Sequence, residues 1–274
     1  HVTVEFCVSV ITQSVSSMRK CLAIVFLITC WVMAQLYVFV ALVVGLCRYR
    51  GEKTPFSHAF AEGFCRLLFN ARVEYLNPKM REEIRQQDQC MLLYNHRSVA
   101  DFTVSTYTTA PERLSYVGRV GVCWLLPLAL LTFSLIENNA ILFYRGRKDR
   151  RKMQQKLFAR MDKLIKKGLF VTVFPEGHRN TKKTTLPLKR GAISWAFDND
   201  VPCAIVLHDG NEDMVREKEL SFKRGVKVKC LHQGIYYPRD YSNRRVFFDT
   251  ISREFAQGYA ELIANKPKEE SRND

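Results

Sequence analysis

The sequence lacks the short motifs that mark several common enzyme classes. It contains no G-x-S-x-G turn, no phosphate-binding P-loop, no G-x-G-x-x-G fingerprint and no H-E-x-x-H pair. Its nine cysteines include no C-x-x-C pair and no zinc-ligand spacing, and none lies beside a histidine in a nucleophile motif. A covalent intermediate is therefore not indicated.

Acidic residues are scarce relative to basic ones. The chain of 274 residues has 27 Asp and Glu against 42 Lys and Arg, which gives a formal net charge of +15. Its partners should be anionic: nucleic acid, phospholipid head groups or a polyanionic cofactor. The odd number of cysteines and the absence of Asn-x-Ser/Thr sites indicate reduced thiols and a reducing compartment.

Residues 21–47 form a long uncharged run. A bilayer core needs about 20 apolar residues, whereas the core of a signal peptide has only about 7–15. We interpret the run as a transmembrane or membrane-embedded helix; the alternative is a buried helix of a soluble core. Residues 56–69 form a second amphipathic stretch that would pair with it. A slight excess of Lys and Arg after the run places its C-terminal side in the cytosol.

Apolar runs typical of strands alternate with helical patterns through the rest of the chain. The pattern predicts an α/β fold with a central, mostly parallel twisted sheet flanked by helices, preceded by the membrane-embedded helical segment. Residues 122–136 are apolar and interrupted by Pro127, which fits either core or the wall of an acyl-chain site. We read Asn77-Pro78 as a turn. The predicted strands cover 72–76, 91–94, 140–144, 169–174, 201–207 and 222–230, and the main helices cover 149–167, 193–197 and 249–265.

We divide the chain into four segments on this basis. They are an N-terminal segment (1–20), a membrane-embedded helical pair (21–70), the α/β domain (71–265) and a polar tail (266–274).

A histidine and a carboxylate follow the predicted strand 91–94 at close spacing. His96 lies where the strand ends, and Ser98-x-x-Asp101 reads as a capping box that opens a helix. Asp101 would then lie in the first turn of the helix, where it can fold back toward the imidazole. A histidine oriented by a carboxylate is a common general base. The alternative is that Asp101 only caps the helix and His96 is a turn residue.

Polar groups stand at three predicted strand ends: Asn95-His96, Arg145, and Glu176-Gly177 with Arg179. In open α/β sheets, ligand sites gather at the carboxyl ends of strands. Arginine presents a planar fork that suits phosphate. A base beside an anion-binding site suits transfer to a phosphate-bearing substrate.

These residues resemble the signatures of the membrane glycerolipid acyltransferases. Asn95-His96-Arg97-Ser98-x-x-Asp101 is similar to that family's N-H-x-S-x-x-D block, and residues 174–180 are similar to its F-P-E-G-T-R-[SN] block. Residues 142–145, 186–191 and 201–202 resemble its weaker blocks. The sequence departs from the family at four positions: Asn139 replaces Gly, Leu142 replaces Phe, His178 replaces Thr and Ile205 replaces Pro.

The resemblance implies roles for individual residues. His96 would be the base and Asp101 its orienting carboxylate. A basic set (Lys182, Lys183, Lys189, Arg190) would bind the phosphates of CoA, although a solvated surface explains each of these cations equally well. The implied substrate-binding residues are Asn95, Arg145, Glu176, Gly177 and Arg179.

The resemblance also implies the reaction. The protein would move a fatty acyl group from acyl-CoA to the sn-2 hydroxyl of lysophosphatidate and so form phosphatidate, and Arg179-Asn180 favours this acceptor. It would need no metal and no tightly bound cofactor. Its partners would be a phospholipid membrane and the two substrates, without nucleic acid. Its location would be the endoplasmic reticulum with the catalytic domain facing the cytosol, or else a mitochondrial or plastid membrane.

Two other readings remain open at this point. The acceptor could instead be glycerol-3-phosphate or another lysophospholipid. Alternatively, the chain could be a non-catalytic, membrane-bound basic module for anionic lipid or RNA, although no nucleic-acid signature with aromatics on basic strands is present.

Overall fold

A computed structural model gives the fold of most of the chain after residue 60. It describes residues 61–109, 114–119, 140–143, 150–216, 219 and 221–264, together with helical residues 17–18, 20–22, 24–26, 28–29, 31–33 and 35–36.

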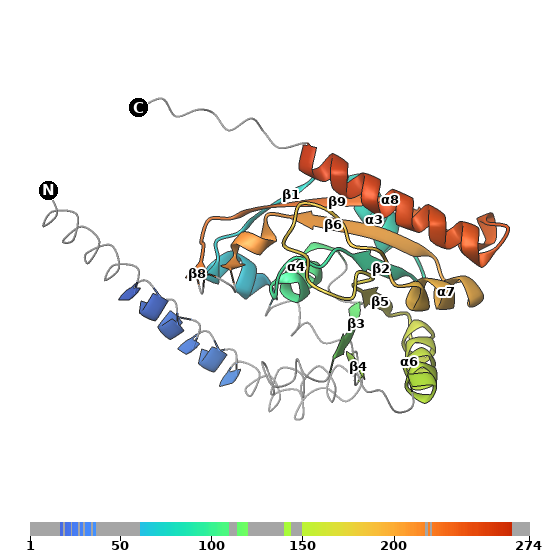
Figure 1. Ribbon diagram of the computed structural model, residues 1–274, viewed down its shortest axis with the longest axis horizontal. Helices are drawn as coiled ribbons and strands as arrows, with labels where there is room; N and C mark the ends of the chain where they lie inside the picture. The colour runs from blue at the N-terminus through green and yellow to red at the C-terminus, as the bar shows by residue number, and fades with distance from the viewer. Residues whose placement is uncertain are drawn as a thin grey trace, which may run out of the picture.

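A seven-stranded sheet in the order β1-β9-β6-β2-β5-β3-β4 forms the centre of the molecule (Figure 1). Strands β6, β2, β5, β3 and β4 pair in parallel, whereas β9 runs antiparallel to β6 and carries β1 parallel to itself. The predicted α/β fold with a mostly parallel sheet is therefore confirmed. The strands are β1 (Arg72–Tyr75), β2 (Met91–Tyr94), β3 (Leu114–Arg119), β4 (Ala140–Phe143), β5 (Phe170–Val173), β6 (Cys203–Asp209) and β9 (Lys227–Tyr236), with a separate hairpin of β7 (Val215–Arg216) and β8 (Ser221–Phe222).

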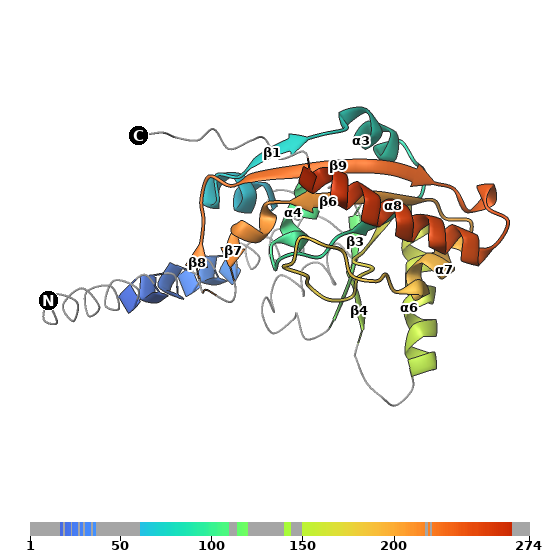
Figure 2. The same cartoon turned by 45° about the horizontal axis from the view of Figure 1, so that its top comes forward.

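Helices cover both faces of this sheet (Figure 2). Helices α6, α7 and α8 share one hydrophobic cluster with the sheet, and α8 runs along β6 and β9. Helix α3 packs on the opposite face, against β9. The helices are η1 (Gly63–Leu68), α3 (Pro78–Arg85), α4 (Asp101–Thr108), α6 (Arg150–Ile165), α7 (Arg190–Asp198), η4 (Asn211–Asp213), η5 (Pro238–Asp240) and α8 (Arg244–Ala264).

Strand β2 shows why the sheet is buried on both sides. Successive side chains of a strand point to opposite faces. Met91 and Leu93 therefore lie in the cluster under α6, α7 and α8, whereas Leu92 and Tyr94 lie in the cluster under α3. All four side chains are fully buried, as expected of a parallel strand with helices on both faces.

The structure corrects several boundaries. Asn77-Pro78 begins α3 instead of forming a turn: the Asn77 side chain accepts a hydrogen bond from the Met80 backbone N–H at 3.3 Å, and proline fits the first helical turn. Strand β3 was not predicted. The predicted strand 222–230 is divided between β8 and the longer β9, and α8 begins at Arg244 rather than at residue 249.

The membrane-helix prediction is not settled by the described part of the chain. No described helix has both the length and the apolar composition to span a bilayer. Residues 37–60 and several positions of the run 21–36 lie outside the described residues, as do the apolar stretch 122–136 and Arg145. The membrane-embedded pair therefore stays a prediction.

We expect Phe255→Ala to lower the free energy of unfolding by about 3–5 kcal/mol, because it opens a cavity where α8 packs against the sheet. Phe255 is fully buried in the main core. Gln257→Ala, on the exposed side of the same helix, should change stability by less than about 0.5 kcal/mol. Chemical denaturation followed by circular dichroism measures both values. Equal losses in the two variants would contradict this packing.

Candidate active site

The carboxyl ends of three neighbouring strands bring the candidate site together. Strand β2 lies between β5 and β6 and is parallel to both. His96 follows β2, Glu176 follows β5, and Asn211 follows β6. The strand ends that the sequence singled out after β2 and β5 are thus adjacent in space, and β6 contributes a third that the sequence did not indicate.

His96 and Asp101 form a hydrogen-bonded pair. Nδ1 of His96 lies 2.6 Å from Oδ2 of Asp101, and the side chain of His96 is 26% exposed whereas that of Asp101 is 1% exposed. The Phe174 ring stacks on the imidazole at a centroid distance of 4.6 Å. Because a carboxylate accepts hydrogen bonds, Nδ1 carries the proton and Nε2 is left as a base.

Asp101 is held by the turn that precedes α4. Its Oδ2 also accepts hydrogen bonds from the backbone N–H of Arg97 at 2.5 Å and of Ser98 at 3.0 Å. Ser98 Oγ in turn accepts from the N–H of Ala100 at 3.1 Å. The expected capping box is wrong as a helix cap, because α4 begins at Asp101 with Ala100 as its N-cap and no side chain caps it. Asp101 lies in the first turn, as predicted, and its carboxylate binds the preceding turn and His96.

Burial raises the pKa of Asp101, and hydrogen bonds from His96, Ser98 and Arg97 act in the opposite direction. These donors stabilise the ionised carboxylate in a place from which water is excluded. A buried carboxylate that keeps its charge is well suited to stabilise an imidazolium on its partner.

Glu176 clamps two loops to each other. Its Oε2 accepts from the His96 N–H and its Oε1 from the Leu186 N–H, each at 2.8 Å. Burial raises its pKa, opposed by these two hydrogen bonds. Gly177 follows with a φ of 71°, in the left-handed region that favours glycine. Glu176 and Gly177 thus shape the loop beside His96.

Arg97 is a buried arginine whose role the sequence did not reveal. Its guanidinium donates to the carbonyl oxygens of Lys182 and Thr181 and to Glu212 Oε1, the last at 3.2 Å. It also lies over the Tyr259 ring, 5.1 Å from the centroid. Arg97, which lies between His96 and Ser98 in the sequence, therefore anchors the basic loop, residues 179–190.

The predicted cations of the basic loop are exposed, but one of them, Lys183, is held in ion pairs. Arg179 is exposed, and the next residue, Asn180, donates its backbone N–H to the His96 carbonyl at 2.7 Å, which places Arg179 close to the pair. Lys182, Lys189 and Arg190 are exposed. Lys183 instead forms ion pairs with Asp209 and Glu212, so its charge is already matched by two carboxylates.

Asn95 joins two strands. Its side chain is buried, donates to the His208 carbonyl at 2.7 Å and accepts from the His208 N–H at 2.8 Å. The structure therefore gives Asn95 a role in fixing β2 against β6, where we had expected substrate contact. His208 itself is buried. Its Nε2 forms a hydrogen bond with Thr108 Oγ1 at 3.0 Å, and its ring stacks on that of Tyr94.

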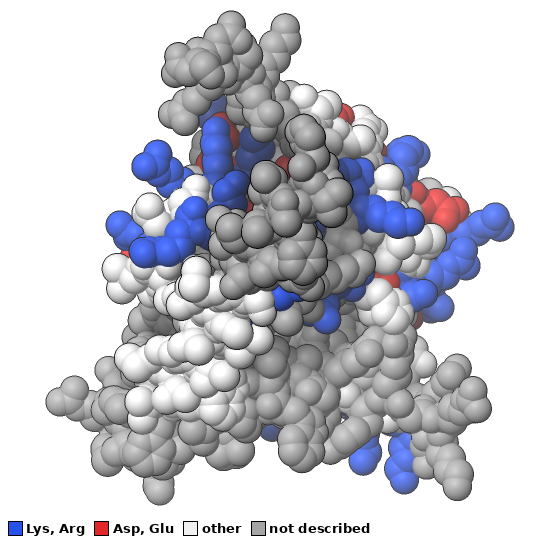
Figure 3. All heavy atoms as spheres, turned by 60° about the vertical axis from the view of Figure 1, so that its left-hand side comes forward, with Lys and Arg blue, Asp and Glu red and all other residues white. Residues whose placement is uncertain are grey.

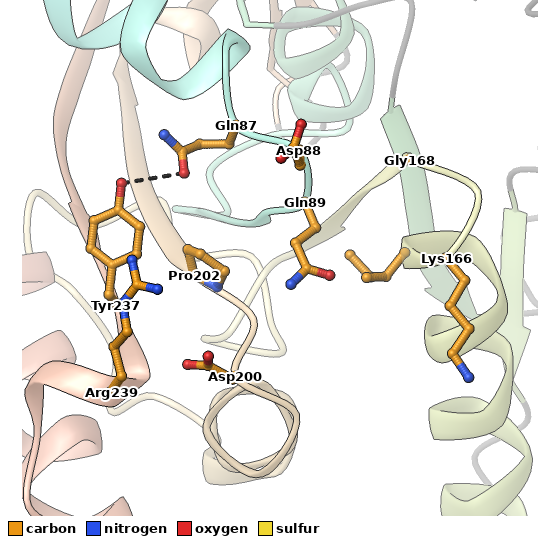
Figure 4. A pocket seen from close by; sticks show the side chains of 10 residues that line it. Gln87, Asp88, Gln89, Lys166, Gly168, Asp200, Pro202, Tyr237 and Arg239 are labelled. Atoms are coloured by element: carbon orange, nitrogen blue, oxygen red, sulfur yellow. Dashed lines mark hydrogen bonds between the residues drawn. The ribbon is translucent and has the colours of Figure 1, made fainter.

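A pocket of about 450 Å³ opens at the other end of the sheet (Figure 4). Gln89, Gly168 and Pro202, which line it, precede β2, β5 and β6, so it lies at their amino ends. His96 follows the carboxyl end of β2, so this pocket lies at the opposite end of the strands from the candidate site. Among the described side chains, no cluster of three or more His, Cys, Asp or Glu could hold a metal ion.

Comparison with known proteins agrees with this geometry. Residues 76–206 match the family model described as Acyltransferase. The range begins just before α3, ends within β6, and contains both His96 and Glu176.

Two curated relatives align with longer parts of the chain. The human protein 1-acyl-sn-glycerol-3-phosphate acyltransferase beta is 25% identical over 196 residues, which cover 70% of this chain and 67% of the relative. The 1-acyl-sn-glycerol-3-phosphate acyltransferase of Haemophilus influenzae is 27% identical over 135 residues, which cover 49% of this chain and 52% of that enzyme.

The fold also matches a solved structure. The crystal structure of the 1-acyl-sn-glycerophosphate (LPA) acyltransferase PlsC from Thermotoga maritima superposes with a TM-score of 0.70 at 18% identity and covers 92% of this chain and 100% of that one. At this identity the match concerns the fold.

We expect His208→Gln to weaken the dependence of stability on pH. Burial lowers the pKa of His208 to about 3, from an ordinary 6.5. Below about pH 6.5 the imidazole of His208 is therefore protonated in the unfolded chain but stays neutral in the folded one. The free energy of unfolding accordingly decreases as the pH falls from about 6.5 toward 3. Between pH 7 and pH 5 this histidine accounts for about 2 kcal/mol of lost stability.

Denaturant titrations at pH 7 and pH 5 measure this effect. The drop in unfolding free energy should be about 2 kcal/mol smaller in His208→Gln than in the wild type. The same drop in both proteins would show that His208 is protonated in the folded state.

Proposed function

We propose that the protein is an acyltransferase that converts lysophosphatidate to phosphatidate, a step of phospholipid biosynthesis, and the match of residues 76–206 to the Acyltransferase family model supports this proposal. The observation that carries this proposal is the His96–Asp101 pair, exposed only on its histidine side and placed beside the loop that holds Arg179. The two curated relatives are named as acyltransferases for the same acceptor.

In the proposed reaction, Nε2 of His96 removes the proton from the free sn-2 hydroxyl of the acceptor. The resulting oxygen attacks the carbonyl carbon of the acyl thioester, and the bond to sulfur breaks as the ester forms. The proton on the imidazolium passes to the departing thiolate. Asp101 holds the ring and balances the positive charge while the proton resides there.

Acceptor binding follows from the position of Arg179. A phosphate monoester is recognised best by a planar fork of N–H donors, and Arg179 presents one on the loop tied to His96. We infer that Arg179 binds the phosphate of lysophosphatidate and so places its hydroxyl at His96. Arg145 stays a proposed second ligand on sequence grounds alone. Holding two substrates at one base contributes several kcal/mol to catalysis.

We propose acyl-CoA as the donor. Lys182, Lys189 and Arg190 are the exposed cations that would bind its phosphates. Lys183 is left out of this set because it is paired with Asp209 and Glu212. The thioester supplies the activated acyl group, so the chemistry needs no tightly bound cofactor.

We further propose that the protein works at a membrane surface, in a membrane such as the endoplasmic reticulum, with its domain on the reducing side. The ring of Phe26 stacks on that of Phe222, with 3.8 Å between the ring centroids, and this contact attaches the N-terminal helical residues to the domain. In Figure 3, which looks at this side, Lys and Arg gather along the upper edge of the described uncharged surface. The exposed apolar side chains of the N-terminal helical residues and of η1 are Met18, Leu22, Ile24, Val25, Ile28, Trp31, Val32, Met33, Leu36 and Leu67.

We expect His96→Ala to lower kcat by about 10²–10⁴-fold, because it removes the general base. Asp101→Asn should lower kcat within a similar range, because an amide can donate to Nδ1 and favour the wrong tautomer. Transfer of a labelled acyl group from acyl-CoA to lysophosphatidate in detergent micelles measures these rates. Thermal unfolding of each variant is the control for folding, and turnover retained by folded His96→Ala would remove His96 as the base.

Arg179→Ala should raise KM for lysophosphatidate by about 10- to 100-fold, because the charge-assisted phosphate contact is lost. The KM for acyl-CoA should change little. Arg245→Ala, which removes a highly exposed arginine of α8, is the matched control and should behave like the wild type. An effect on acyl-CoA alone would assign Arg179 to the donor instead.

A further inference from the structure

Asn211 is a buried amide that the reaction scheme above does not use. It is the first residue of η4, directly after β6 and Gly210, and it is 0% exposed. It lies beyond residues 76–206, the part of the chain that matches the family model. Its role must therefore be read from its contacts.

The backbone before Asn211 is tightly constrained. Gly210 has a φ of 91°, and a Cβ at that position would overlap the backbone carbonyl oxygen of Lys227 in β9. Only glycine allows this approach, so the chain turns sharply at the end of β6. The turn fixes the direction in which the next side chain leaves the backbone.

The Asn211 side chain reaches the catalytic carboxylate. Its Nδ2 donates a hydrogen bond to Oδ1 of Asp101, whereas Oδ2 of Asp101 receives His96 and the two backbone N–H groups. A carboxylate only accepts hydrogen bonds, which fixes the amide with its nitrogen toward Asp101. Asn211 therefore occupies the one carboxylate oxygen that the turn before α4 does not bind.

The oxygen of the Asn211 amide makes no compensating contact among the described residues. Within the described part of the chain, Oδ1 of Asn211 is buried without a hydrogen-bond partner. A buried polar atom left without a partner destabilises the fold, and an apolar side chain of similar size would avoid this cost. The contact with Asp101 therefore explains the presence of asparagine here, because an apolar side chain would leave Oδ1 of Asp101 without this donor.

We propose that Asn211 is a positioning residue for acyl transfer: it stops the Asp101 carboxylate from rotating and so keeps Nε2 of His96 directed at the acceptor hydroxyl. This inference rests on the proposed function, because it requires His96 to be the base. Asn211 acts through Asp101 and touches neither substrate.

The next residue on the same turn supports the acceptor loop. Glu212 accepts hydrogen bonds from Arg97 at 3.2 Å and from Lys183 at 2.5 Å. The charged groups that these contacts connect to the His96–Asp101 pair include Glu176 after β5, Arg97 after β2, Glu212 on η4, and Lys183 with its second partner Asp209. Because the two supports are separate, loss of Asn211 should affect kcat, whereas loss of Glu212 should affect KM for the acceptor.

The test compares Asn211→Leu and Asn211→Ala with the wild type in the acyl-transfer assay across pH. We expect kcat to fall about 10- to 100-fold, with KM for lysophosphatidate within about twofold. The acidic limb of the pH–rate profile should move to higher pH, because a carboxylate that has lost a donor attracts the imidazolium more strongly. Thermal unfolding should show that the Asn211→Leu variant is folded.

Asp213→Asn is the matched control, because it removes an exposed carboxylate of the same turn that pairs with Arg216. It should keep the wild-type kcat and pH profile. If the folded Asn211 variants keep the wild-type kcat and pH–rate profile, this inference is overturned but the proposed function stands. If neither variant folds, Asn211 has a structural role and the inference is likewise overturned. An inactive wild type would overturn the proposed function together with the inference.

Discussion

The site depends on one buried carboxylate, that of Asp101, and on the donors that surround it. Asp101 is almost inaccessible to solvent, yet it accepts four hydrogen bonds, from the backbone of Arg97 and Ser98 and from the side chains of His96 and Asn211. An unpaired carboxylate at this depth would be strongly destabilising. The donors that stabilise the charge also fix the direction of the carboxylate, and with it the tautomer and orientation of the imidazole.

The donors to Asp101 come from segments that are far apart in the sequence and that the folded sheet brings together: the turn after β2 and η4 after β6. Three parallel strands end side by side, and each contributes a polar residue that holds the chemistry in place: His96 after β2, Glu176 after β5 and Asn211 after β6. Arg97 and Glu212 link the same strand ends to the basic loop. The proposed base His96 and the proposed phosphate ligand Arg179 thus lie on loops of one connected hydrogen-bonded framework, which explains how a loop-borne site can be held in place.

The alternation of helical and strand patterns predicted the α/β fold, because a sheet buried on both faces leaves continuous apolar runs in the sequence. His96, Asp101, Glu176 and Arg179 were found because they cluster in short motifs. Asn211 and Arg97 were not, because their importance lies in contacts across long sequence separations. Strand β3 was missed, and Asn77-Pro78 was misread because the same pair suits both a turn and a helix start. The amide of Asn95 joins strands, a pairing that no local pattern reveals.

The central claim is that Asp101 holds His96 with its proton on Nδ1, leaving Nε2 as the base. The most direct measurement is ¹⁵N NMR of the imidazole in protein labelled at histidine, near neutral pH, with Asp101→Asn for comparison. The account predicts a protonated Nδ1 and an unprotonated Nε2 for His96 in the wild type, with this preference lost in the variant. A wild-type His96 protonated on Nε2, or the same tautomer in both proteins, would contradict it.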